Sequence, residues 1–246
     1  MRKLQIIAVV VIYSLLLGCA TNEKTTVQSD KSSKINVELG ITYMREGKYN
    51  TAMDRLQKAI RQDPTNPLAY SSMALLNMRL EQLDEAEKNF EKALKIDPES
   101  SAIRNNYGAL LCQSKRFKAA QEQFVLATKN PLYQTPEHAF LNAGKCSENK
   151  VDAEKFFRAA LRKNPVLPGA LLEMARLSLE LKRHLSARAY LQRYHAVHDP
   201  DAASLWTSVQ VEKVLGDANT MESHALLLKR KFPDSEETRQ YLHWVK

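Results

Sequence analysis

The pattern of apolar and polar residues divides the chain into three unequal parts. Arg2 and Lys3 precede an apolar run over residues 6–17, and Gly18 ends it. The run of 12 residues is shorter than the roughly 20 apolar residues that a membrane-spanning helix needs. A positive start, a short apolar run and a small residue are the layout of a secretory signal. We therefore predict a signal peptide over residues 1–18.

A cysteine follows the apolar run directly. Residues 16–19 read LLGC, which resembles the lipobox of bacterial lipoproteins. The resemblance implies that the Cys19 thiol carries a diacylglycerol and that the signal is cut just before it. Ala20, where Asp would favour the inner membrane, implies an outer-membrane lipoprotein that faces the periplasm. The alternative is an ordinary cleaved signal, or an uncleaved anchor, in which Cys19 is incidental.

The second part is polar. Residues 20–33 contain one large apolar residue and many Ser, Thr, Lys and Asp. Such a segment cannot bury enough apolar surface to offset the entropy that ordering costs. We predict a lipidated N-terminus and flexible tether over residues 19–33.

The third part, residues 34–246, is rich in the helix-favouring residues Ala, Leu, Lys, Glu and Gln. No alternation typical of strands stands out, and the whole chain has only seven glycines. Six prolines recur at gaps of 33 to 35 residues, and five of them follow Asp or Asn, a pair that ends helices and starts turns. They are Pro64, Pro98, Pro131, Pro165, Pro200 and Pro233. A period near 34 indicates a repeat of two helices.

The residues within each period resemble the tetratricopeptide repeat, in which small residues allow the two helices to cross closely. Repeat one carries the pattern in order: Leu39, Gly40, Tyr43, Ala52, Leu56, Ala59 and Pro64. The resemblance predicts an all-α superhelical solenoid of about six helix-turn-helix repeats. Each repeat buries its apolar face against its neighbours, so we expect residues 34–246 to form a single solenoid. A last helix should cap it, with Tyr241, Leu242 and Trp244 on its packing side.

Repeat four departs from this pattern. Nine residues separate Gly144 from Ala153, whereas twelve separate Gly108 from Ala120. About three residues are therefore missing from the first helix of repeat four or from its turn, and the packing there should differ.

Candidate chemistry is sparse. His195 and His198 are three residues apart and could share a helical face, but no further His or Cys stands at ligand spacing, so we expect an exposed helix end. The chain has no Gly-rich phosphate loop and no nucleophile motif. We therefore predict no enzyme, no catalytic residue, no metal, no cofactor and no small-molecule substrate.

The formal net charge of +8 could suggest nucleic acid as a partner. Lys and Arg are spread along the helices, however, and the predicted export signal leads away from the cytoplasm. We expect no nucleic-acid partner.

Cys112 and Cys146 remain after Cys19. They lie 34 residues apart in the predicted first helices of repeats three and four, which are neighbours in a solenoid. The periplasm permits a disulfide between them. The alternative is two buried free thiols.

Two segments carry residues that the general tetratricopeptide pattern does not specify. Residues 105–112 read NNYGALLC, and residues 130–146 read NPLYQTPEHAFLNAGKC. Together with the lipobox and the six-repeat layout, they resemble the type IV pilus biogenesis lipoproteins of the PilF/PilW family. The resemblance implies a pilotin, which binds secretin subunits and promotes their outer-membrane localisation and multimerisation. It also favours the Cys112–Cys146 bond. The alternative is a repeat lipoprotein that serves as a scaffold for outer-membrane protein or peptidoglycan machinery.

A second apolar stripe remains on the first helices of repeats one and two, at spacings that share one helical face. Its members are Val37, Ile41, Met44, Ser71, Leu75 and Met78. In the repeat family these places face the concave groove, and modules that grip acidic tails carry Lys, Arg and Asn there. Here the places are mainly apolar, so we predict a groove for an apolar peptide or strand of the secretin, to which flexible methionines adapt. The alternative is that neighbouring helices or an N-terminal segment cover the stripe.

Overall fold

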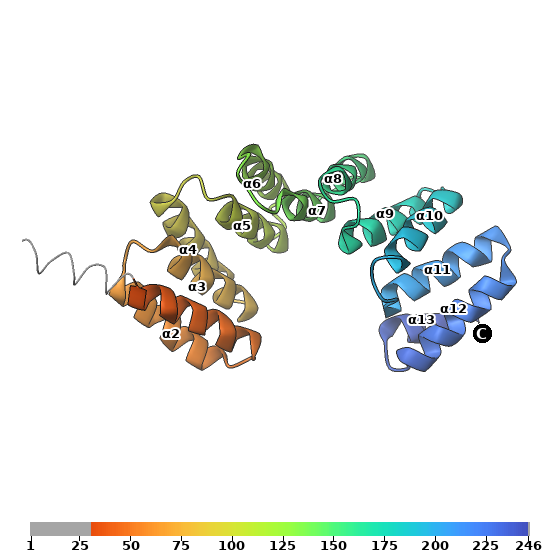
Figure 1. Cartoon of the computed structure of the whole chain (residues 1–246), viewed down its shortest axis with the longest axis horizontal. Coiled ribbons are helices and arrows are strands. Elements are labelled where there is room, and N and C mark those ends of the chain that lie inside the picture. Colours follow the sequence, from red (N-terminus) through yellow and green to blue (C-terminus); the bar gives the residue numbers. More distant parts are fainter. Residues whose placement is uncertain (1–30, 246) are drawn as a thin grey trace, which may run out of the picture. The chain divides into compact units, whose positions relative to one another are not determined.

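The computed structural model describes residues 31–245, and every regular element in this range is helical (Figure 1). The all-α prediction is therefore confirmed. The predicted signal peptide, Cys19 and residues 20–30 of the predicted tether lie outside the described residues. Within the described range, no helix combines the length and the apolar character that crossing a membrane requires.

Residues 31–45 form the first described helix. The helices that follow are α2 (Tyr49–Gln62), α3 (Pro67–Arg79), α4 (Leu83–Ile96), α5 (Ser101–Gln113), α6 (Phe117–Lys129), α7 (Pro136–Lys145), α8 (Lys150–Lys163), α9 (Pro168–Glu180), α10 (His184–His195), α11 (Ala202–Leu215), α12 (Ala218–Lys231) and α13 (Glu236–Trp244). Consecutive helices pack as antiparallel pairs, such as α3 with α4 and α9 with α10. The pairs make about six repeats, as the proline period predicts.

The described helices fall into two compact units that divide within α5, between Leu110 and Leu111. In unit 1 the core lies between the helix over residues 31–45, α2 and α3, where Met44, Leu56 and Leu76 pack together. Gly40 lies so close to Leu56 that an added Cβ would stand 2.7 Å from its side chain. This is the close helix crossing for which the repeat pattern requires a small residue.

Unit 2 contains a similar close helix crossing, in which the side chain opposite the glycine is larger. An added Cβ at Gly144 in α7 would stand 2.4 Å from the ring of Phe157 in α8. Phe157 also packs against Met174 and Leu177 of α9, so its ring joins repeat four to repeat five. Small residues thus set the distance within a pair, and large ones fill the space between pairs.

The turn between the two helices of a repeat needs one residue in the left-handed region. These residues are Gly47, Glu81, Lys115, Lys182 and Gly216, with φ between 58° and 78°. Neighbouring members lie 34 residues apart, except that 67 residues separate Lys115 from Lys182. They therefore occupy equivalent places in successive repeats. The missing member belongs to repeat four, where Asn149 has φ −125° and caps α8 instead.

The first helix of repeat four is short, as expected. α7 has 10 residues, whereas α5 and α9 have 13 each. The second helices keep the period, because α6, α8 and α10 begin at Phe117, Lys150 and His184. The shortening is therefore confined to α7, because the turn after it, residues 146–149, is not shorter than the turns after α5 and α9.

Two predicted boundaries need correction. Residues 31–33 were expected in the tether but are helical, and Ser33 is fully buried. Its hydroxyl donates to the Ala59 carbonyl at 2.9 Å and accepts from the Asn66 amide at 2.9 Å, which ties it to the array. At the other end, the rings of Tyr241 and Trp244 contact Trp206, as the predicted packing side requires, whereas Leu242 and Trp244 are each 45% exposed.

Candidate partner-binding site

The six predicted groove residues lie on the first two inner helices of unit 1, and the structure divides them by exposure. Val37, Met44 and Ser71 are buried. Ile41, Leu75 and Met78 are partly exposed. Only the second group can touch a partner in this arrangement.

The buried members belong to the interface between repeats. Val37 packs with Ala59 and Ala69, and Met44 packs in the cluster around Leu56. The Ser71 hydroxyl donates to the Leu68 carbonyl within its own helix, so it offers no free donor. The stripe is therefore partly covered by neighbouring helices, which was the alternative for it.

The accessible members differ in how much they pack against the core of unit 1. Ile41 packs against two clusters of unit 1, around Leu56 and around Val37, and Leu75 packs against the first of them. Met78 belongs to neither cluster. Met78 is thus the groove residue with the most freedom to contact a partner.

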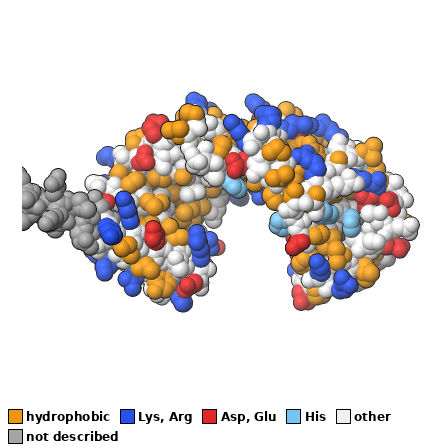
Figure 2. Space-filling view, viewed as in Figure 1, with side chains coloured by type: hydrophobic (Ala, Val, Ile, Leu, Met, Phe, Trp, Pro, Cys, Tyr) orange, Lys and Arg blue, Asp and Glu red, His pale blue; other side chains and the backbone are white. Residues whose placement is uncertain are grey.

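Two lysines of unit 1 lie over tyrosine rings. Lys92 Nζ lies 5.8 Å from the ring centroid of Tyr70, and Lys48 Nζ lies 5.8 Å from that of Tyr43. On the face shown in Figure 2, hydrophobic side chains gather over α2 and α3 with Lys and Arg side chains around them. The cation on Tyr70 was not anticipated, since nothing in the sequence pattern brings Lys92 to that ring. The accessible apolar side chains Ile41, Leu75 and Met78 suit an apolar segment of a partner.

Cys112 and Cys146 are joined in the structure, with their Cα atoms 5.8 Å apart. This distance lies in the usual range for a disulfide. Cys112 lies in the last turn of α5 and Cys146 caps α7, so the pairing fastens the end of α5 to the shortened helix. Both residues belong to unit 2.

His195 and His198, at the end of α10, contact different groups and do not form a metal-binding pair with each other. His198 Nδ1 lies 2.6 Å from the Asp199 carbonyl oxygen, while the His195 ring meets His224 of α12. Among residues 31–245, no three His, Cys, Asp or Glu side chains surround a common point.

Comparisons with known proteins agree with the fold. Models of the tetratricopeptide repeat match residues 40–81 and 67–100. The type IV pilus assembly protein PilF of Pseudomonas aeruginosa PAO1 is 29% identical to this chain over 234 residues, which cover 92% of this chain and 93% of PilF.

Two solved structures are similar over nearly their full length. The structure of Pseudomonas aeruginosa PilF matches with a TM-score of 0.78 at 28% identity, over 88% of this chain and 99% of that one. The structure of PilW, a widely conserved type IV pilus biogenesis factor, matches with a TM-score of 0.77 at 32% identity, over 85% of this chain and 98% of that one.

Proposed function

We propose that this chain, which belongs to the PilF/PilW family of tetratricopeptide-repeat type IV pilus assembly proteins, acts as a pilotin. It binds subunits of the pilus secretin and promotes their localisation and multimerisation in the outer membrane. The observation that carries the proposal is similarity to two pilus proteins over nearly the full length of the chain. A protein of this kind works by binding, without catalysis or a cofactor.

The proposed anchor is a lipid on Cys19, after removal of residues 1–18, which holds a periplasm-facing protein at the outer membrane. Two or more acyl chains give stable attachment, since each buried methylene contributes roughly 0.8 kcal/mol. A Cys19→Ala chain should lose lipid labelling and outer-membrane fractionation while its repeats fold normally. Fractionation that is unchanged in this variant would contradict an anchor at Cys19.

The proposed binding site is the accessible part of the unit 1 stripe, which is Ile41, Leu75 and Met78. Its occupant is an apolar peptide or strand of the secretin. Val37, Met44 and Ser71 are buried, and Val37 and Met44 belong to the clusters against which Ile41 packs.

The decisive variant is Met78→Asp. A carboxylate there opposes an apolar partner, and Met78 lies outside the two clusters around Leu56 and Val37. We expect heat-stable secretin multimers to fall several-fold while thermal unfolding and lipid labelling stay near wild type. Leu226→Asp is a matched control, because Leu226 is 62% exposed on α12 in unit 2.

Two results would contradict the proposal at different levels. Normal multimers with Met78→Asp would reject the site but leave the function standing. A deletion strain that keeps its pili and secretin multimers, with defects in the outer membrane or septum instead, would favour an envelope scaffold and reject the function.

A further inference from the structure

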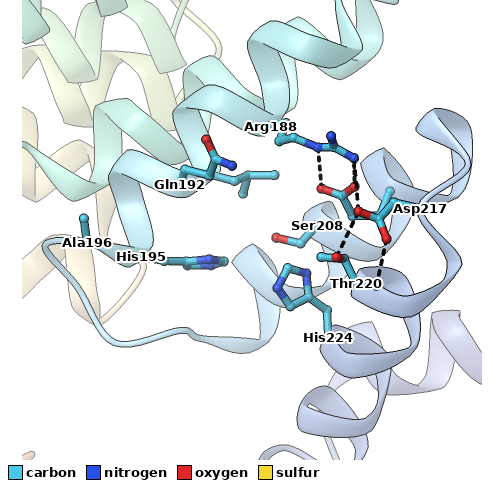
Figure 3. A pocket seen from close by; sticks show the side chains of 10 residues that line it. Arg188, Gln192, His195, Ala196, Ser208, Asp217, Thr220 and His224 are labelled. Carbon is cyan, nitrogen blue, oxygen red and sulfur yellow. Dashed lines mark hydrogen bonds and ion pairs between the residues drawn. The ribbon is translucent and has the colours of Figure 1, made fainter.

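A cavity of about 490 Å³ lies within unit 2. α10 and α12 form its walls, and both pack on α11, which forms its floor. Figure 3 shows its polar side chains, which come from all three helices and from the turn before α12. Nothing in the proposed pilotin activity uses this space.

One end of the cavity is an ion network. Arg188 of α10 donates through Nε to Glu212 Oε1 at 2.9 Å and through Nη2 to Glu212 Oε2. The same Nη2 lies 3.8 Å from Asp217 Oδ2. Glu212 is only 4% exposed, so a charged side chain is buried at the floor. One guanidinium faces two carboxylates, and the network has a formal charge of −1.

The other end holds two imidazoles from opposite walls. The ring centroids of His195 and His224 lie 5.8 Å apart, with the ring planes at 80° (Figure 3). His195 Nε2 and His224 Nδ1 are buried and have no hydrogen-bond partner. Burial lowers the pKa of both imidazoles, and each lowered pKa favours the neutral ring that carries a lone pair.

We propose that His195 Nε2 and His224 Nδ1 bind one divalent transition-metal ion of the Zn²⁺ type. Imidazole nitrogen suits Zn²⁺, Cu²⁺ and Ni²⁺. With metal–nitrogen bonds of about 2.0–2.1 Å, two imidazoles that share an ion have ring centroids about 5 to 6.5 Å apart. The observed 5.8 Å lies inside this range. The negative network beside the rings attracts a cation.

The site is open. Since no third His, Cys, Asp or Glu is arranged around the same point among the described residues, water completes the coordination. The ion joins α10 to α12, which belong to successive repeats and have no direct backbone contact. Because the folded chain binds it and the unfolded chain does not hold this geometry, the ion stabilises the C-terminal repeats by mass action.

The test is Zn²⁺ binding by the full chain at neutral pH, measured by equilibrium dialysis at a temperature where every variant is folded. We expect one ion per wild-type chain and at least a tenfold loss of affinity in both His195→Gln and His224→Gln. Dialysis reads binding directly, so a lower stability of a variant does not obscure it. The melting temperature of the wild type should also rise with Zn²⁺ concentration.

Two matched controls separate this site from surface binding. His198→Gln removes the histidine three residues from His195, and His243→Gln removes an exposed one on α13. Both should bind like wild type. The proposal is overturned if wild type binds no ion at a large excess of Zn²⁺, or if the His195→Gln/His224→Gln double variant binds as well as wild type.

Discussion

At the scale of single residues, the contact between Gly144 and Phe157 is the most exacting in unit 2. Gly144→Ala places a methyl group 2.4 Å from Phe157 Cε1, so the ring or the helix must move. Overpacking of this kind costs about 1–3 kcal/mol, whereas Ala in place of Gly in a helix gains only about 0.5–1 kcal/mol. We expect a net loss of unfolding free energy of about 1 kcal/mol, measured by urea denaturation.

A second substitution checks the cause. Phe157→Leu shortens the side chain, so Gly144→Ala should cost less in that background than in wild type. Equal costs in both backgrounds would show that the methyl group meets something other than the ring.

Residue-level predictions from the sequence succeed where a local pattern carries them. Gly40 and Gly144 follow from the repeat pattern, and the structure shows the close crossings that they permit. The contact of His195 with His224 does not follow, because the two residues lie 29 apart and meet only across the cavity over α11. Likewise, helical spacing shows that Val37 and Ile41 share a face but not how far the next helix covers it.

At the scale of elements, the turns within repeats carry a left-handed residue at equivalent places. A non-glycine residue pays roughly 1–2 kcal/mol for this conformation, and Gly avoids that cost but loses about 0.5–1 kcal/mol in entropy on folding. Glu81→Gly and Lys182→Gly should therefore raise the free energy of unfolding by about 0.5–1 kcal/mol each. Both side chains are exposed, so little packing is lost.

The reverse change is the control. Gly216→Ala should lower the free energy of unfolding by a similar amount, and no atom within 4 Å of the new Cβ would confound the result with a clash. The free energies of unfolding come from chemical denaturation. If both kinds of substitution changed this free energy in the same direction, the preference of these turn positions for glycine would be wrong.

The existence of the helices and the short α7 could be read from the sequence, because proline spacing and the count from Gly144 to Ala153 are both local. Ser33 could not be placed, because its burial depends on hydrogen bonds to Ala59 of α2 and to Asn66, which caps α3. A polar residue at the edge of a polar segment looks the same whether or not such partners exist.

At the scale of the molecule, the paired cysteines are the covalent element. A bond that closes a loop of this length, with a sequence separation of 34, should contribute roughly 3–4 kcal/mol. We expect protein purified from the periplasm to show no alkylatable thiol at Cys112 or Cys146 in mass spectrometry without reductant. The same chain should unfold at lower denaturant concentration after reduction. Two free thiols would reject the bond.

At this scale the sequence predicts which helices pack together, but it does not predict which side chains meet between repeats. A 34-residue period specifies which helices are neighbours, so the fold class and the partners of each helix follow from it. The proposed groove and the cavity depend on contacts between side chains of different repeats, which a repeat period does not specify. The burial of Met44 and the contact of His224 with His195 are two examples.

The burial of Ser33 has a mechanical consequence. Its hydroxyl joins the third described residue to Ala59 and Asn66, so the described array is tied together from its first helical turn. Tension that passes through the preceding segment, for instance from a membrane attachment pulling against a bound subunit, would act on these hydrogen bonds of the packed first repeat. Ile41 of the proposed binding surface belongs to that same repeat, and Leu75 and Met78 belong to the next one, so load and ligand would act on adjoining repeats.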